Sequence, residues 1–387
     1  MTQKVHDSDR HVTECPSLWK NYLTKSVFEQ CPVELVHDDE KKAKDRMDKF
    51  GARAAVPLPP AYYVNGKPAL SNWDLSHQVE SAYKSGRSQS NRNLAKNAEG
   101  QLEAMQSEQV TSASLFPTFA TFIINNENVP NHISVEFAKA YNRWILDYCQ
   151  DASNQLDPVA KISRADSTTL VEQVELALSQ GFRSVTIRPE VIAGKAIHHD
   201  DYKAFWHACA ANDLPISFHG GTHAHLNTCG TERYTDHFSL HACSHAFEAQ
   251  KAFISLVGSG ILASNPKLKI AFLEAGCSWL PNLLFRLDNL CAQEFKNITN
   301  QSMKMLPSEY FKRNCWVGVE LDEPSINDVI SLVGADKLLY GTDFPHPDHH
   351  ESNPVNSKLL QSLTYEQQQQ LLYKNAEQFF NFKSNIN

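Results

Sequence analysis

The stretch Lys337–Asp348, KLLYGTDFPHPD, begins as a short apolar run and ends on the carboxylate of Asp343, which two prolines and a histidine follow. A carboxylate at the end of a buried strand is costly unless a partner neutralises its charge. In a closed barrel of parallel strands, the carboxyl ends of all strands converge on one pocket, and polar residues there serve that pocket. This stretch therefore predicts the last strand of such a barrel.

Seven further apolar runs precede it, and most of them also reach a polar residue. They are KVHDSD ending at Asp9, VTSASLFPT near Pro117, LDPVAKIS near Lys161, FRSVTIRPE reaching Glu190, LPISFHGG reaching His219, LKIAFLEAG reaching Glu274 and CWVGVE ending at Glu320. Segments with apolar residues at every third or fourth position separate these runs, as in amphipathic helices. Eight alternating units predict an α/β fold of the (β/α)8 barrel type. A doubly wound sheet is the alternative, but no G-x-G-x-x-G follows the first run.

One segment interrupts this rhythm. Residues 37–108 are polar, charged and poor in strand formers, whereas the whole chain of 387 residues suits one large barrel domain. Long connections in compact domains are often lids or oligomer contacts, so we expect a long insertion after strand one that contains helices and covers the barrel mouth. A solvated surface excursion is the alternative.

Composition restricts the class of partner. Lys and Arg total 36 against 44 for Asp and Glu, and the net charge of -8 argues against nucleic acid and anionic membrane. The chain has no apolar run long enough for a membrane helix and no apolar core in its first residues. Its nine cysteines form no C-x-x-C pair, which argues against a zinc knuckle or a disulfide framework. We expect a cytoplasmic protein with a small-molecule substrate.

Four residues at the strand ends form a candidate metal site. Asp9 and His11 are two apart on an extended chain, so both side chains project to one side and can bind one cation. His219 ends the fifth run and Asp343 ends the eighth. Imidazole and carboxylate suit Zn, Mn or Fe, with one or two ions per chain, and a cation removes the cost of burying Asp343. Taken singly, an exposed turn, a core histidine and a helix cap are the alternatives.

Two more residues are candidates for proton transfer. Glu274, at the end of the sixth run, could bind a second cation, accept a proton, orient a substrate ammonium, or simply pair with Arg286. His245 stands just before the helical stretch AFEAQKAFISLVG and could act as acid or base, because the pKa of histidine lies near neutral pH. A surface or helix-capping histidine is the alternative.

Two residues are candidates for substrate binding. The guanidinium of Arg188 offers a forked partner for a carboxylate, although a buried pair with Glu190 is equally compatible with the sequence. His346 could orient either Asp343 or the substrate.

Several segments, in order along the chain, resemble the amidohydrolase superfamily, and within it the branch that includes enzymes of the aminocarboxymuconate semialdehyde decarboxylase type. They are DSDRHVTECPSLWKNYL, FAKAYNRWILDYC, IRPE, FWHACAANDLPISFHGG, NPKLKIAFLEAGCSWLPNLLFRLD, LPSEYFKRNCWVGVE and KLLYGTDFPHPD. The resemblance implies a metal-dependent (β/α)8 barrel with ligands at Asp9, His11, His219 and Asp343. Two departures stand out: Asp9-x-His11 replaces the common H-x-H, and Glu274 stands where decarboxylase-type members have a catalytic histidine.

The reaction we predict first is hydrolysis of an ester, thioester, amide or lactone. A divalent ion lowers the pKa of its bound water from 15.7 to about 7, Asp343 is the candidate base, and His245 and Glu274 are further acid or base candidates. Non-oxidative decarboxylation of an aromatic or unsaturated carboxylic acid is the alternative, and Fe or Fe/Mn oxygen chemistry is a third. A non-catalytic binding barrel is the fourth. The insertion and an apolar C-terminal helix suggest a homodimer.

Overall fold

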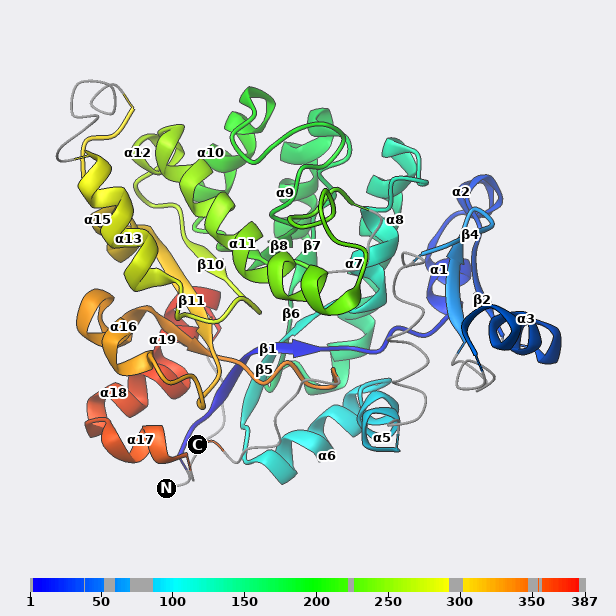
Figure 1. Ribbon diagram of the computed structural model, residues 1–387, viewed down its shortest axis with the longest axis horizontal. Coiled ribbons are helices and arrows are strands. Elements are labelled where there is room, and N and C mark those ends of the chain that lie inside the picture. The colour runs from blue at the N-terminus through cyan, green and yellow to red at the C-terminus, as the bar shows by residue number, and fades with distance from the viewer. Residues whose placement is uncertain are drawn as a thin grey trace.

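The computed structural model describes residues 3–37, 39–51, 60–69, 86–221, 226–291, 302–346, 354 and 357–382. Parallel strands form its centre (Figure 1). They are β1 (His6–His11), β5 (Ser112–Phe116), β6 (Leu156–Pro158), β7 (Ala160–Lys161), β8 (Val185–Ile187), β9 (Ile216–Phe218), β10 (Ile270–Phe272), β11 (Cys315–Val319) and β12 (Leu338–Tyr340). Each of the eight predicted runs contains a strand. The third run contains two, because Val159 divides one strand into the successive pieces β6 and β7.

The strands close into a barrel. Hydrogen bonds link them in the orders β1-β5-β6 and β7-β8-β9-β10-β11-β12. The last strand returns to the first, since the backbone N–H of Asp343 donates to the carbonyl oxygen of Asp9 at 2.8 Å and the N–H of His11 donates to the carbonyl oxygen of Phe344 at 2.7 Å. The predicted (β/α)8 barrel is confirmed.

Helices connect and cover the strands. In the described part of the chain they are α1 (Ser17–Tyr22), α2 (Lys25–Gln30), α3 (Glu40–Phe50), α5 (Gly86–Leu94), α6 (Ala98–Glu108), α7 (Phe119–Ile124), α8 (Asn131–Cys149), α9 (Leu170–Ser179), α10 (Lys203–Ala211), α11 (His237–Gly258), α12 (Ile261–Ser264), α13 (Leu280–Asn289), α15 (Pro307–Asn314), α16 (Ile326–Val333), α17 (Lys358–Ser362), α18 (Tyr365–Gln369) and α19 (Asn375–Phe380). None of these helices combines the length and the apolar character needed to cross a membrane.

Residues alternate between the inside of the barrel and the helix layer, as the pleat of a strand requires. Ile187, Phe218 and their equivalents pack outward in the large core beneath the helices. The inward residues form a second cluster together with aromatic residues of the C-terminal segment. This cluster contains Phe116, Val159, Ala271, Leu273, Trp316, Leu339, Ala376, Phe379, Phe380 and Phe382. Helix α19 therefore closes the amino-terminal end of the barrel and leaves the opposite end for a site.

The segment 37–108 contains the predicted helices and also strands that its polar composition does not suggest. Strands β3 (Ala61–Val64) and β4 (Lys67–Pro68) lie in this segment, and β3 pairs antiparallel with β4 and with β2 (Val33–Val36), which precedes the segment. This small sheet projects with α2 and α3 from one side of the barrel (Figure 1). Helix α6 packs on β1, where Gln101 accepts from Arg10 Nε at 2.7 Å and donates to the carbonyl of His11 at 2.7 Å. Residues 38, 52–59 and 70–85 lie outside the described residues. A lid in this segment stays a prediction.

Candidate active site

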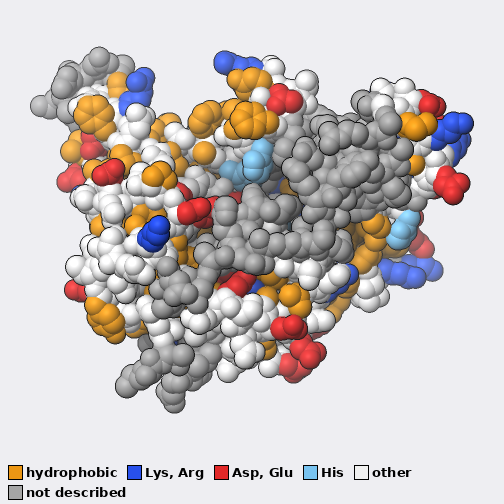
Figure 2. All heavy atoms as spheres, turned by 60° about the horizontal axis from the view of Figure 1, so that its bottom comes forward, with side chains coloured by type: hydrophobic (Ala, Val, Ile, Leu, Met, Phe, Trp, Pro, Cys, Tyr) orange, Lys and Arg blue, Asp and Glu red, His pale blue; other side chains and the backbone are white. Residues whose placement is uncertain are grey.

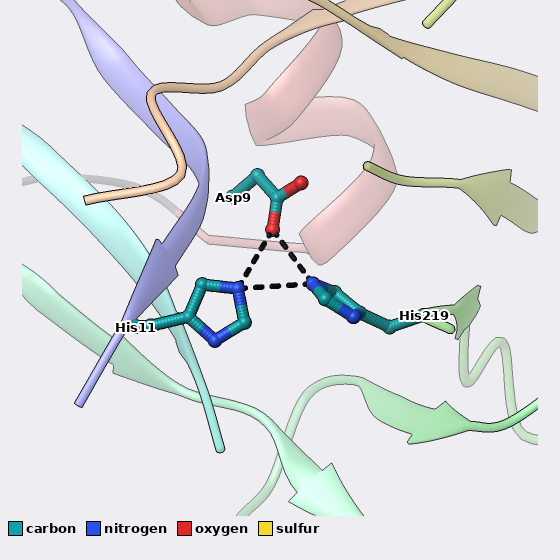
Figure 3. Close-up of side chains that lie close together, drawn as sticks. All are labelled: Asp9, His11 and His219. Atoms are coloured by element: carbon teal, nitrogen blue, oxygen red, sulfur yellow. Dashed lines mark hydrogen bonds and ion pairs between the residues drawn. The ribbon is translucent and has the colours of Figure 1, made fainter. Parts of the chain in front are cut away.

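Three side chains from two strand ends meet at one point inside the barrel. Asp9 and His11 come from β1, and His219 directly follows β9. The Nε2 atom of His219 lies 3.0 Å from Asp9 Oδ1 and 3.0 Å from His11 Nε2, and His11 Nε2 lies 3.5 Å from Asp9 Oδ1 (Figure 3). All three residues are buried. The i, i+2 spacing of Asp9 and His11 thus does place both groups on one side of the strand.

The opposite ring nitrogens decide what this cluster can hold. His11 Nδ1 lies 3.1 Å from the carbonyl oxygen of Pro117, and His219 Nδ1 lies 3.3 Å from that of Gly220 and 3.4 Å from Glu274 Oε2. A neutral imidazole has one N–H, and these acceptors assign it to Nδ1 in both rings. Two bare Nε2 atoms and one carboxylate oxygen then converge on each other. Such a set fits a divalent cation, with backbone and carboxylate groups fixing the ring tautomers.

Asp343 adds a fourth donor from the other end of the chain. Its Oδ1 atom lies 3.3 Å from His11 Nε2 and 2.6 Å from His346 Nδ1. His346 also contacts Thr118 Oγ1 through Nε2 at 3.1 Å. Asp343 has a left-handed backbone, with φ of 55°, in which its N–H reaches β1. The structure thus brings Asp9, His11 and His219 into one candidate metal group, and Asp343 into a second that shares His11 and includes His346. One ion bound by all four predicted ligands stays a prediction.

Glu274 lies beside this cluster, and its contacts are with the far side of His219. Its Oε2 atom is 3.4 Å from His219 Nδ1 and 3.3 Å from His245 Nε2, and its Oε1 atom is 3.9 Å from His346 Nδ1. Burial would raise the pKa of Glu274, but the neighbouring His245 and His219 hold it well below its usual range. The described ion pairs of Glu274 are therefore with histidines and not with Arg286. Its backbone is also left-handed, with φ of 52°.

His245 completes a pair with Glu274, but its helical position differs from the prediction. Helix α11 begins at His237, because the side chain of Asp236 caps it by accepting from the N–H of Ser239 at 2.9 Å. His245 is therefore inside the helix and not at its start. Its Nδ1 atom lies 3.3 Å from Ser244 Oγ, which leaves Nε2 directed at Glu274.

Arg188 forms the buried pair with Glu190 that the sequence left open. Its Nε donates to Glu190 Oε2 at 3.0 Å and its Nη2 donates to Glu190 Oε1 at 2.6 Å. Both side chains are fully buried. The third nitrogen, Nη1, has no hydrogen-bond partner among the described residues. A contact between Arg188 and substrate stays a prediction.

Two carboxylates that support the candidate site, Asp7 and Glu14, were not predicted from the sequence. Asp7 accepts from the N–H and the hydroxyl of Thr342 and from Arg10 Nη1 at 3.1 Å, so it ties β1 to the residue before Asp343. Glu14 accepts from the backbone N–H groups of Thr118, Phe119 and Ala120, each at 3.0 Å, and so holds the start of α7. Of these two residues, only Asp7 could have been predicted from the sequence to lie near the site, since it lies two residues before Asp9 in the same run.

One face of the molecule shows histidine side chains among acidic and hydrophobic side chains (Figure 2).

Comparison with known proteins identifies the family. Residues 74–382 match the family model described as Amidohydrolase, so the chain belongs to the amidohydrolase family and is an enzyme of that family. The family predicted from the sequence is confirmed.

Among curated proteins, the chain is 28% identical over 150 residues to a gamma-resorcylate decarboxylase of Polaromonas sp.. The alignment covers 37% of this chain and 44% of the relative, so less than half of that enzyme is matched.

Solved structures resemble the chain over nearly its whole length. The amidohydrolase map2389c from Mycobacterium avium subsp. paratuberculosis superimposes with a TM-score of 0.76 at 17% identity, covering 98% of this chain and 100% of that one. A 5-carboxyvanillate decarboxylase from Novosphingobium aromaticivorans with bound manganese gives 0.70 at 15% identity, covering 98% and 97%. A dihydroxybenzoic acid decarboxylase from Polaromonas sp. with bound manganese and 2-nitroresorcinol gives 0.67 at 15% identity, covering 98% and 97%. At these identities the likeness shows the fold. The manganese in two relatives agrees with the divalent cofactor predicted from the sequence.

Proposed function

We propose that this protein is a divalent-metal-dependent decarboxylase of an aromatic or unsaturated carboxylic acid. The observation that carries the proposal is the convergence of Asp9 Oδ1, His11 Nε2 and His219 Nε2 within 3.5 Å of one another, with the His245–Glu274 pair beside them. The curated relative and several structural relatives are decarboxylases. They support the alternative reaction predicted from the sequence better than hydrolysis, and none of them points to oxygen chemistry.

Asp9, His11, His219 and Asp343 would hold the metal ion. Two carboxylates and two imidazoles suit manganese, zinc or iron, and the relatives favour manganese. When bound, the ion supplies positive charge that anchors and polarises an oxygen-bearing group of the acid. Glu274 faces the Nδ1 side of His219, so we place it outside the ligand set.

The His245–Glu274 pair is our candidate for the proton donor. Glu274 accepts from His245 Nε2, which lies 3.3 Å away, and its negative charge favours a protonated imidazole. When the carbon–carbon bond breaks and CO₂ leaves, the electron pair stays on the ring carbon, and the proton from His245 Nε2 completes the product. Solvent then reprotonates His245. The pair would thus take the role of the catalytic histidine that decarboxylase-type relatives carry at the end of strand six.

Asp343 has a different role in this reaction from the one in hydrolysis. Its Oδ1 atom already accepts from His346 Nδ1 at 2.6 Å, and decarboxylation requires no base for a water molecule. We therefore assign Asp343 to metal binding, with His346 as its positioning residue and Thr118 fixing His346 in turn.

Deuterium incorporation tests the reaction. The manganese-loaded protein is incubated with 2,6-dihydroxybenzoate and related hydroxybenzoic acids in D₂O, and CO₂ and ring deuterium are measured. We expect one deuteron at the vacated carbon for each CO₂ released, and loss of both in His245→Gln with metal content unchanged. Release of no CO₂ from any of these acids, together with Asp343-dependent cleavage of esters or lactones, would establish hydrolysis instead.

We also retain the predicted cytoplasmic homodimer as a proposal. Phe238 on α11 and Phe285 on α13 have 82% and 69% of their surface exposed, and such apolar groups are available for a contact between copies. Sedimentation of the wild type and of Phe238→Ser tests the dimer. We expect the wild type to sediment as a dimer and the variant as a monomer.

A further inference from the structure

We propose that Lys161 and Arg188 form a receptor for a second carboxylate of the substrate, inside the barrel and beside the metal-binding residues. This inference rests on the proposed function, because it takes the substrate to be an acid held by the metal through another group. It narrows the substrate class to dicarboxylic acids.

The side chain of Lys161 points into the barrel. Its neighbours Ala160 and Ile162 belong to the outer core under the helices, whereas Val159 belongs to the inner cluster. Because side chains alternate along a strand, Lys161 shares the inner face with Val159. Asn142 on α8 bonds both the N–H and the carbonyl of Lys161 from outside, at 2.7 and 3.0 Å, which fixes the backbone in this orientation.

Arg188 shares that inner face at the level of the metal cluster. Ile187 and Phe218 are register partners on adjacent strands, and the N–H of His219 donates to the carbonyl of Ile187 at 3.1 Å. The next residues, Arg188 and His219, are therefore neighbours on the inside. Lys161 pairs in register with Thr186, two residues before Arg188, so it lies one inward layer below the arginine on the adjacent strand.

Both cationic side chains carry an unused donor. Lys161 Nζ and Arg188 Nη1 have no hydrogen-bond partner in the described structure, although 0% and 1% of the respective residues are exposed. Buried charged donors are costly unless they are paired. The other two nitrogens of Arg188 are committed to Glu190, which leaves Nη1 as the group available to a ligand.

Two of the three buried cations in this part of the barrel form no ion pair among the described residues. Arg188 pairs with Glu190, whereas Arg164 donates to backbone carbonyls and Lys161 Nζ has no partner. Burial and the nearby Arg188 lower the pKa of Lys161 to about 7. An anion between Lys161 and Arg188 would supply the missing partner for both donors.

Gly221 packs closely against Arg188. A Cβ atom at Gly221 would lie 2.8 Å from Arg188 Nη1 and 3.0 Å from Phe122 Cε1, so the lack of a side chain there lets the guanidinium lie against the backbone, where its Nη2 donates to the Gly221 carbonyl. Phe122 supplies an apolar wall at the same point. A carboxylate attached to an apolar ring matches this combination of groups.

Calorimetry with two simple acids tests the receptor. Isophthalate carries two carboxylates on one ring and benzoate carries one, and each is titrated into manganese-loaded wild type and Lys161→Met. We expect wild type to bind isophthalate at least about tenfold more tightly than benzoate, the effect of one hydrogen bond to a charged group. Lys161→Met should remove this preference and leave benzoate binding unchanged.

A second readout separates a binding role from a structural one. Lys161→Met replaces an unpaired buried charge with an apolar chain of similar length, so we expect the ligand-free variant to melt at a higher temperature than wild type. Lys337→Met is the matched control, because Lys337 is also buried but pairs with Asp336 at 3.3 Å and covers the Trp316 ring. That control should lose stability and keep the preference for isophthalate.

Three results would overturn the receptor: no preference for isophthalate in wild type, an unchanged preference in Lys161→Met, or a lower melting temperature of that variant. Calorimetry reports binding, so its outcome is independent of turnover. A protein that selects isophthalate through Lys161 yet releases no CO₂ would refute the proposed reaction alone. If the protein releases CO₂ from hydroxybenzoic acids but Lys161→Met keeps the wild-type preference for isophthalate, the receptor alone is refuted.

Discussion

Asp7 binds Thr342 with both oxygens of its carboxylate. The backbone N–H of Thr342 donates to Oδ1 at 3.0 Å and its hydroxyl donates to Oδ2 at 2.6 Å, across 335 positions of the chain. Thr342 precedes Asp343, and Asp7 precedes Asp9 by two residues, so this contact fixes the separation of two proposed metal ligands from opposite ends of the sequence. Neither Asp7 nor Thr342 belongs to the donor groups that could hold the ion.

Asp7→Asn should therefore weaken metal binding without removing a ligand. We expect a loss of about 10- to 100-fold in manganese affinity, the usual effect of a group that orients a ligand. Equilibrium dialysis measures it, with Asp200→Asn as a control because the Asp200 side chain is 82% exposed. Equal affinity in wild type and Asp7→Asn would show that the barrel seam holds the donors without this carboxylate.

Gly341→Ala should also disturb the metal site. The added Cβ would lie 2.6 Å from the Cβ of Asp9, a separation that forces β1 to move. We expect loss of stoichiometric manganese and of activity. Gly258→Ala is the matched control, since nothing lies within 4 Å of its new Cβ. Elemental analysis of both variants provides the measurement, and normal manganese content in Gly341→Ala would contradict the packing argument.

Removal of the metal ion should lower the thermal stability of the protein. The whole effect should depend on the proposed metal ligands. A ligand at a thousand times its Kd stabilises the folded state by about 4 kcal/mol. We expect manganese to raise the melting temperature of chelated wild type and to leave that of His219→Asn unchanged. A manganese-dependent shift that survives in His219→Asn would place the ion elsewhere.

Glu274→Gln should lower kcat and keep the metal. The neutral amide no longer favours a protonated His245, so proton transfer should slow by about 10²- to 10⁴-fold while KM changes little. Manganese content should equal that of wild type, because Glu274 contacts the Nδ1 side of His219. Loss of the ion in this variant would instead make Glu274 a ligand, as one sequence-based alternative had it.

The stability of the protein should rise between pH 7 and pH 10 because of Lys161. Its pKa is lowered to about 7 in the folded protein by burial and by Arg188, opposed by Glu190, and lowered further by Arg164. An unfolded lysine has a pKa of about 10.4, so in this interval the unfolded chain binds more protons and stability increases with pH. Below pH 7 the full cost of the buried charge is present. Urea denaturation across this range should show a shallower rise in Lys161→Met, and parallel curves for the two proteins would refute the assignment.

The barrel was predictable because each of its strands is a short apolar run bounded by turns and amphipathic helices. The proximity of Asp9 to His219 and of His11 to Asp343 was predictable for a related reason: strand ends of a parallel barrel point at one place, although these residues are far apart in sequence. The small sheet β2-β3-β4 was not predictable from the sequence, since antiparallel strands of two to four residues have too few positions for a period-two pattern.

The contacts that position the candidate site residues could not be predicted from the sequence either. His245 projects toward Glu274 because Asp236 starts α11 earlier than the apolar periodicity suggests. Asp7 and Glu14 act through tertiary contacts whose partners, Thr342 and the start of α7, have no local signature.

The left-handed backbone of Asp343 and Glu274 has a consequence for how this enzyme can change over time. With φ of 55° and 52°, each residue adopts a conformation that costs an L-residue about 1 kcal/mol and that glycine adopts freely. A duplicated copy that no longer needs turnover would gain stability by exchanging either acid for glycine. Under the proposed function, selection for chemistry keeps the acids at both positions, and we expect a relative with glycine there to be a stable but inactive protein.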